Sequence, residues 1–181
     1  MPGFAGNVAG CAAVLAAVAL LSFGLPAIND AIPPTRPVSA SRPYGIGLNV
    51  SVKPPTQTVV DSRGTVPAAN RVLFVRNGVQ YRLEAEQFSG DLAALTASVR
   101  DEVADGRGAQ AIGPDIDTKT TQGVPGMAAR FEESDGGGFF AAYLSGGVGV
   151  DVFVLGTDQG VTDNADEILR SVATLRFGAG A

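Results

Sequence analysis

The sequence predicts an α+β domain, a mostly antiparallel sheet of about six strands covered by two amphipathic helices, after one N-terminal transmembrane helix. Three observations predict it: a long uncharged apolar run near the start, strand-like segments joined by short Gly-containing turns, and two segments with helical periodicity. Strands linked by hairpins pair antiparallel. We expect a transmembrane anchor at 1–28, a Pro-rich tether at 29–45 and the globular domain at 46–181.

The predicted anchor is Val8–Ile28, which is uncharged for 21 residues. Its centre, Ala12–Leu21, contains only Ala, Val and Leu. At the helical rise per residue such a helix is about 30 Å long, the thickness of a bilayer's hydrocarbon core. We therefore expect a single-pass protein of the cell membrane.

Two alternatives to an uncleaved anchor, and its orientation, stay open. A cleaved signal peptide usually has a basic start and an A-x-A site, and neither is present. Cys11 lies in a lipobox-like stretch, but that stretch precedes the apolar core.

Arg36 and Arg42 follow the segment, which by the positive-inside rule favours a cytoplasmic domain. The Pro-rich tether and a domain without Cys are typical of an envelope protein, so we favour the extracytoplasmic (periplasmic) side.

The predicted tether contains Pro33, Pro34, Pro37 and Pro43. Proline fixes φ and has no N–H to donate. We expect neither helix nor ladder here, but an extended spacer of about 3.1 Å per residue.

Strands begin the globular domain. Apolar residues alternate with small or polar ones over Ile46–Val52, which predicts one half-buried strand. A short strand follows near Thr58–Val60. Arg71–Arg76 and Val79–Ala85 flank Asn77-Gly78, a pair that favours φ > 0 at both central positions of a type I′ hairpin turn.

The first helix is predicted over 89–106, with Gly106 as the residue after its C-terminal cap. One face of it is apolar: Leu92, Leu95, Val99 and Val103. The second helix is predicted over Thr162–Ala173. Its expected apolar face is Ala165, Ile168, Leu169 and Val172. A short terminal strand or extension follows at Thr174–Phe177.

Three strands are predicted between the helices: Val124–Glu132, Phe139–Leu144 and Val150–Leu155. Asp135–Gly138 and Ser145–Gly149 are expected to be the loops that join them. An extra strand near Asp115–Thr121 is a further alternative.

The order of these elements over about Ile46–Phe177 resembles the PsbP-like fold, which the Ran-binding Mog proteins share. The resemblance rests on five features: the alternating strand before Lys53-Pro54-Pro55, the Asn77-Gly78 hairpin, the helix Asp91–Asp105, the Gly-interrupted strands Gly126–Leu155 and the helix from Asp166 to Ala173. The resemblance implies a small membrane-anchored domain of actinobacterial envelopes with a non-enzymatic role. Such a domain would act as an assembly factor, an adaptor, or an accessory of lipid or cargo carriage. Some relatives resemble accessory factors of mycolic-acid export. No motif allows family binding residues to be carried over.

Several chemistries are excluded by composition. The chain has no His, and its one Cys, Cys11, lies in the apolar run. The globular domain therefore cannot contain a Ser-His-Asp or Cys-His catalytic arrangement, a disulfide, or a Cys/His zinc site. Ser145–Gly149 lacks the Lys-Ser/Thr of a phosphate loop. Asp115 and Asp117 lack the spacing of a calcium loop, so surface charge is the favoured interpretation and a cation site the alternative. We expect no enzyme, no cofactor and no metal.

Candidate binding residues are Phe139, Phe140 and Tyr143, which alternate along one strand. Core packing is the ordinary interpretation, and an apolar ligand groove between sheet and helix is the alternative. The net charge of −5 makes nucleic acid an improbable partner. We expect a non-enzymatic accessory or adaptor of a membrane protein complex, with envelope lipid export or secretion as the processes it would serve; alternatively, the domain carries a lipid or other apolar ligand.

Overall fold

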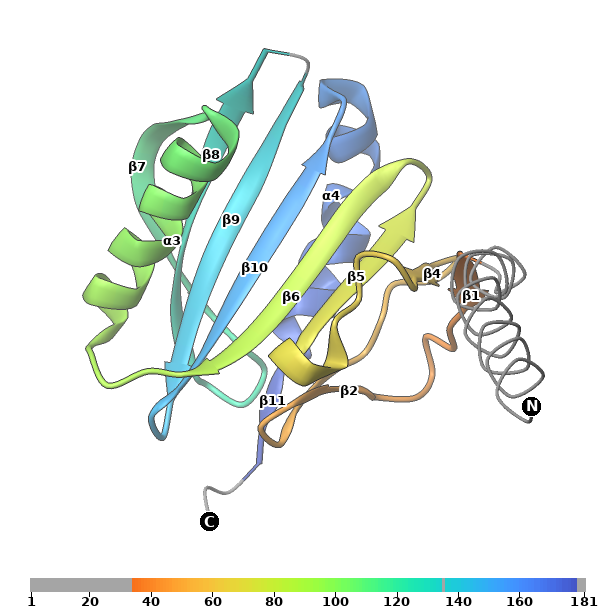
Figure 1. The fold of residues 1–181 in the computed structure, drawn as a ribbon, viewed down its shortest axis with the longest axis horizontal. Helices are drawn as coiled ribbons and strands as arrows, with labels where there is room; N and C mark the ends of the chain where they lie inside the picture. Colours follow the sequence, from red (N-terminus) through yellow and green to blue (C-terminus); the bar gives the residue numbers. More distant parts are fainter. Residues whose placement is uncertain (1–33, 135, 179–181) are drawn as a thin grey trace, which may run out of the picture. The chain divides into compact units, whose positions relative to one another are not determined.

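A computed structural model describes residues 34–134 and 136–178 (Figure 1). The predicted anchor, Val8–Ile28, lies outside these residues. Within them, no helix has the length and apolar character needed to cross a membrane.

The elements follow a strand-rich order. They are β1 (Thr35–Pro37), β2 (Tyr44–Gly47), β3 (Val50–Val52), β4 (Val59–Asp61), the 3-10 helix η2 (Pro67–Ala69), β5 (Arg71–Arg76), β6 (Val79–Gln87), α3 (Leu92–Arg107), β7 (Gln110–Lys119), β8 (Pro125–Glu133), β9 (Gly136–Ser145), β10 (Val148–Gly156), α4 (Asp158–Ala173) and β11 (Arg176–Phe177).

The strands form two antiparallel sheets. The large sheet has eight strands in the order β1-β4-β5-β6-β10-β9-β8-β7, and the small sheet has three in the order β11-β3-β2. The prediction of an antiparallel α+β domain with two covering helices is confirmed for the described part of the chain, but the large sheet exceeds the expected six strands. The additional strands include β1 and β7, which lie at the sheet edges. β7 overlaps the alternative strand near Asp115–Thr121, and β1 falls in the predicted tether.

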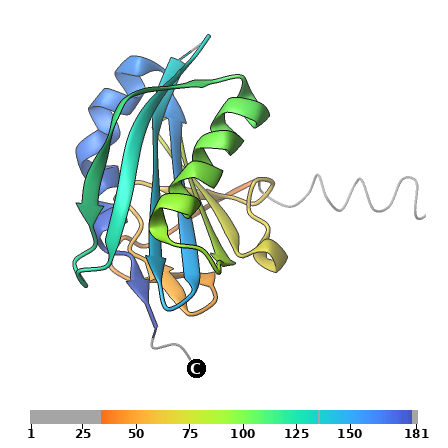
Figure 2. The same ribbon diagram turned by 90° about the vertical axis from the view of Figure 1, so that its left-hand side faces the viewer.

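The two helices cover opposite faces of the large sheet (Figure 2). α3 packs on β7, β8 and β9, with Leu95, Val99 and Val103 fully buried in one core. α4 packs on β6, β10 and β9, with Ile168 and Val172 in the other core. Each helix therefore covers only part of its face.

Two tight turns set the register of the central strands. Asn77 and Gly78 have φ of 48° and 80°, and Arg76 pairs with Val79, so the predicted hairpin is confirmed. Gly146 and Gly147 have φ of 59° and 78° and join β9 to β10 in the same way.

The glycine-rich stretch before β9 differs from its prediction. Gly136–Gly138 were expected in a loop, but they belong to β9 and pair with β8 and β10. A Cβ at Gly138 would collide with the carbonyl oxygen of Val154. These glycines allow close strand approach, a role of Gly in strands that composition does not distinguish from a turn.

The prediction of one strand over Ile46–Val52 is wrong. β2 and β3 are two short antiparallel strands, and Leu48 and Asn49 between them have φ of 48° and 59°. Ile46, Val50 and Val52 are buried in both arrangements, so their spacing did not reveal the turn.

Part of the predicted tether belongs to the sheet. Thr35–Pro37 form β1 and pair with β4, which contradicts the expectation that residues 29–45 make no ladder. β1 is an edge strand, the place in a sheet that tolerates Pro.

Both helices differ in detail from their predictions. α3 is capped by Asp91, whose side chain accepts a hydrogen bond from the Ala94 N–H. It ends at Arg107, and Gly108 caps its C-terminus instead of the expected Gly106. α4 begins at Asp158, four residues before its predicted start, and Thr157 caps it. Its buried residues are Asn164, Ile168, Ser171 and Val172.

Candidate functional site

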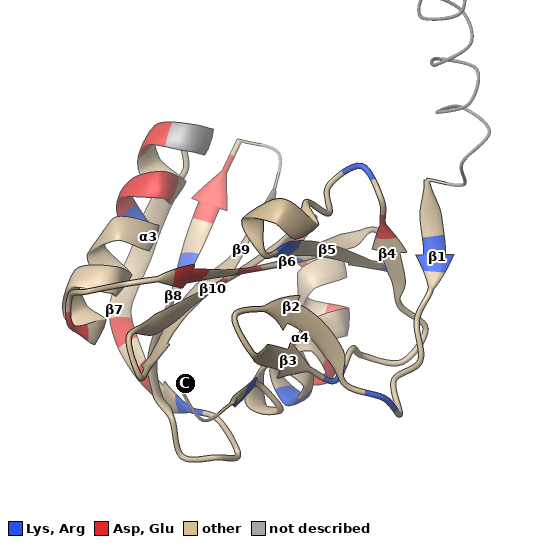
Figure 3. Cartoon of the chain, turned by 60° about the horizontal axis from the view of Figure 1, so that its bottom comes forward, with Lys and Arg blue, Asp and Glu red and all other residues tan. Residues whose placement is uncertain are grey.

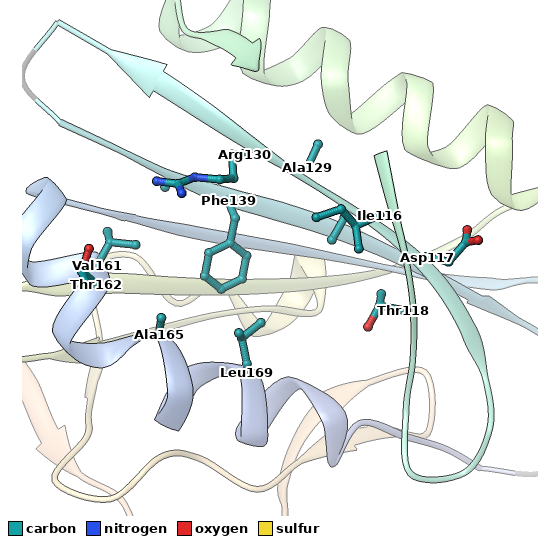
Figure 4. Close-up of a pocket in the computed structure, with 12 residues that line it drawn as sticks. Ile116, Asp117, Thr118, Ala129, Arg130, Phe139, Val161, Thr162, Ala165 and Leu169 are labelled. Carbon is teal, nitrogen blue, oxygen red and sulfur yellow. The ribbon is translucent and has the colours of Figure 1, made fainter. Parts of the chain in front are cut away.

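An apolar groove lies between α4 and the outer strands on the same face of the sheet (Figure 4). Its volume is about 450 Å³. The lining comes from β7, β8, β9 and α4: Ile116, Asp117, Thr118, Ala128, Ala129, Arg130, Gly138, Phe139, Val161, Thr162, Ala165 and Leu169.

The groove follows from the position of α4. The buried face of α4 packs over the middle of the sheet, on β6, β10 and β9, and leaves β8 and β7 uncovered on this side. The adjacent floor is built from small residues, because Ala128 of β8 pairs with Ala141 of β9. No large side chain of this row fills the space beside the helix.

Exposed apolar side chains border the groove. Ile116 of β7 is 60% exposed and Leu169 of α4 is 49% exposed. The two face the groove from opposite sides (Figure 4). Since exposed apolar surface that gathers in one place marks ligand or partner sites, this border is a candidate binding surface.

One end of the groove is polar. A second hollow of about 180 Å³ shares Arg130, Gly138 and Val161 with the groove, and is also lined by Glu132 and Asp158. Arg130 is exposed on β8 and extends beside Phe139 towards the first turns of α4 (Figure 4). The apolar groove thus leads to a site with one cation and two carboxylates.

The structure separates the three predicted site residues. Phe139 is half-buried and lines the groove. Phe140 points to the other face, where it is fully buried beneath α3. Tyr143 shares the face of Phe139 but is only 2% exposed. Its hydroxyl lies 3.4 Å from the Thr118 hydroxyl, and burial raises the pKa of the phenol.

Sequence reasoning did not assign Ile116, Arg130 or Leu169 to the groove. Leu169 was expected to be buried with Ile168, but the face of α4 is rotated towards Asn164 and Ser171. Asn164 accepts hydrogen bonds from Arg76 and Asn77, and Ser171 donates to the Lys53 carbonyl oxygen, so polar residues take core positions. The signal in the sequence was the apolar face predicted for this helix, which includes both Ile168 and Leu169 and is wider than packing against one core requires.

A group of charged side chains lies on the opposite face, beyond the strands β7, β8 and β9 on which α3 mainly packs. Asp151 of β10 stands directly opposite Glu84 of β6. Glu84 accepts two hydrogen bonds from Arg71, at 2.7 and 3.0 Å. Arg82 pairs with Glu102 of α3 at 2.6 Å, and α3 carries further acidic residues (Figure 3).

Asp151 is the unusual member of this group. It is 8% exposed, and its Oδ1 accepts no hydrogen bond from the residues that the structure describes. Burial raises the pKa of Asp151 to about 8, and the nearby carboxylates Glu86, Glu102 and Glu84 add to the rise while Arg82 opposes it. Asp151 is therefore largely protonated at neutral pH.

No metal site was found among residues 34–134 and 136–178, where no three His, Cys, Asp or Glu side chains gather to hold an ion. The two aspartates of the alternative cation site have different surroundings. Asp115 forms an ion pair with Arg100 of α3, and Asp117 borders the groove.

Comparisons with known proteins address the fold. No protein-family model matches the chain, and no curated protein sequence matches it. The solution structure of cyanobacterial PsbP (CyanoP) from Synechocystis sp. PCC 6803 aligns with a TM-score of 0.56, over 76% of this chain and 92% of that chain. The chain has a PsbP-like fold. The expected resemblance is confirmed for the architecture.

The PsbP-like fold carries no site residues with it, because the identity to CyanoP is 9%. A crystal structure from Bacteroides thetaiotaomicron VPI-5482 aligns with a TM-score of 0.36 at 13% identity, over 81% of this chain and 48% of that chain. The fold alone therefore assigns no function to the groove.

Proposed function

We propose that the domain is a non-enzymatic accessory module that holds the apolar chain of a lipid or similar ligand in the groove between α4 and β7–β9. The observation that carries this proposal is the groove of about 450 Å³. Pockets for small ligands measure roughly 300–1,000 Å³ and combine a mainly apolar lining with a few polar groups. The lining from Phe139 to Leu169, with Arg130 at one end, has this character.

The polar groups of the groove support a binding role over catalysis. Nucleophilic catalysis needs a hydroxyl within reach of a general base. The Thr118 hydroxyl lies beside the Tyr143 hydroxyl, whose pKa is raised. The Thr162 hydroxyl donates to the backbone oxygen of Asp158. Among the described residues, neither threonine hydroxyl has a base as its hydrogen-bond partner.

Placement at a membrane is part of the proposal and depends on the sequence. The apolar run Val8–Ile28 would anchor the chain as a single-pass protein, with the domain on the extracytoplasmic side of a cell envelope such as that of actinobacteria. An anchored domain meets membrane lipids at high local concentration. A weak, open groove is then sufficient for transfer of an apolar ligand.

A second candidate is an adaptor for a membrane protein complex. The exposed side chains of Ile116 and Leu169 favour it, since they offer an apolar surface that a partner's side chains would cover. Both candidates use the same surface, so they differ in what occupies it.

The test compares the full-length protein with variants of the groove. Ala165→Trp fills the groove from α4, and Val66→Trp is a control at another exposed apolar position, 39% exposed. Tagged chains are purified from membranes, and both lipids and proteins that copurify are identified by mass spectrometry. We expect a lipid that copurifies with the native chain and the control and is depleted at least fivefold by Ala165→Trp.

The outcomes separate the two candidates. Loss of a specific protein in Ala165→Trp, with no lipid in any sample, would favour the adaptor. If Ala165→Trp changes neither lipids nor proteins, the groove is not the functional site.

A further inference from the structure

The polar end of the groove limits the chemical class of the ligand. Arg130 lies where the apolar groove and the smaller hollow meet, since it lines both. It forms no ion pair with another side chain of the described residues, whereas Arg71, Arg82 and Arg100 each pair with a carboxylate. A guanidinium in such a position is free to bind an anionic group of a ligand.

The two volumes limit the size of that ligand. At roughly 30 Å³ for a group the size of a water molecule, the groove of about 450 Å³ holds about 15 groups and the hollow of about 180 Å³ about six. This is enough for one acyl chain and a compact head. The groove therefore matches the size of one such chain.

The carboxylates of the hollow do not reverse this assignment. Asp158 is the first residue of α4, where a negative charge is stabilised by the helix dipole. Glu132 is exposed on β8, two residues from Arg130 on the same face. Neither is in an ion pair with Arg130. Both repel an anionic head, so they favour a head with a single negative charge over a bulky, multiply charged one.

We propose that the groove binds a single-chain amphiphile whose carboxylate head pairs with Arg130 while its chain lies along Phe139 and Ala165 towards Ile116. A long-chain fatty acid is the simplest such ligand. This inference rests on the proposed function and assigns Arg130 as the residue that selects the head.

The test uses photoactivatable probes that differ only in the head. The full-length protein is reconstituted in phosphatidylcholine vesicles at pH 8.5, because the membrane surface raises the pKa of a carboxylic acid. A diazirine-bearing palmitic acid or the matching hexadecanol is added at equal vesicle content and irradiated. Labelled peptides are mapped by mass spectrometry in the native chain, in Arg130→Gln, and in Arg176→Gln, a control at an exposed arginine of β11.

We expect peptides of β9 and α4 to be labelled about fivefold more by the acid than by the alcohol, the ratio given by an exposed ion pair. Arg130→Gln should bring this ratio to about one without reducing labelling by the alcohol, and Arg176→Gln should leave it unchanged. An unchanged ratio in Arg130→Gln, or equal labelling in the native chain, would overturn the assignment of the head while the groove stands. If neither probe labels these peptides, the proposed function itself fails.

Discussion

Replacing Asp151 by Asn should make the domain more stable, and the gain should grow with pH. Asp151 is buried against Glu84, and its pKa is raised from 3.8 to about 8. The folded state therefore holds a proton that the unfolded chain releases above its ordinary pKa. The stability linked to this proton is complete below pH 3.8, falls as pH rises, and is lost once pH exceeds about 8.

The magnitude follows from linkage. Each pH unit between the two pKa values costs about 1.4 kcal/mol, so the native protein should lose on the order of 4 kcal/mol between pH 5 and pH 8 through Asp151 alone. Asn resembles the protonated carboxyl in shape and does not titrate. The difference in free energy of unfolding between Asp151→Asn and the native chain should increase by this amount over the same range.

Pulse proteolysis of the full-length chain in urea, at pH 5, 6, 7 and 8, measures this difference. Asp101→Asn, at an exposed position of α3, is the control for a general effect of charge. A difference between Asp151→Asn and the native chain that stays constant from pH 5 to pH 8 would show that Asp151 is not kept protonated by the fold.

Three further predictions concern stability, each measured by the urea midpoint of the same assay. Ile168→Ala should cost about 2–5 kcal/mol because Ile168 is fully buried, whereas Leu169→Ala should cost less than about 1 kcal/mol; equal losses would contradict the orientation of α4. Gly138→Ala should lower the free energy of unfolding more than Gly78→Ala does. A Cβ at position 138 would collide with the β10 backbone, whereas a Cβ at position 78 would meet no atom and only the positive φ is unfavourable. The reverse order would contradict the β9–β10 register. Asp91→Ala should cost about 1 kcal/mol through the lost cap of α3, and an unchanged midpoint would argue against that cap.

Local signals were sufficient for the elements whose conformation is determined by adjacent residues. Asn77-Gly78 identifies its hairpin because few pairs adopt φ > 0 at both positions. Leu95, Val99 and Val103 identify the buried face of α3 because their spacing places them on one side of the helix. Thr96 is buried as well, but its hydroxyl is satisfied within the helix by donating to the Leu92 carbonyl oxygen. Both features depend on contacts within about 16 residues of chain.

The groove was less accessible to sequence reasoning because it arises from packing between distant segments. The alternation of Phe139 and Phe140 shows that they face opposite ways, but not which face α4 covers. The exposure of Leu169 depends on Asn164 and Ser171 finding hydrogen-bond partners in residues about 90 and 120 positions away. Arg130 lies at the groove because β8 pairs with β9, which places Arg130 opposite Phe139.

The two uncovered areas of the sheet provide an internal comparison that favours a ligand site. On the α3 side, ion pairs lie over the exposed strands. The Arg82 guanidinium also lies 4.1 Å from the centre of the Phe153 ring, so a cation shields this large apolar side chain. On the α4 side no such cover lies over the groove, and Ile116 and Leu169 stay exposed. A hollow of about 220 Å³ also lies on the α3 side, but Arg71 and Arg82 line it together with apolar side chains, so the two strips differ in charged cover. Incomplete helix cover alone does not account for this difference, whereas the proposed ligand, which would shield the second strip, accounts for it.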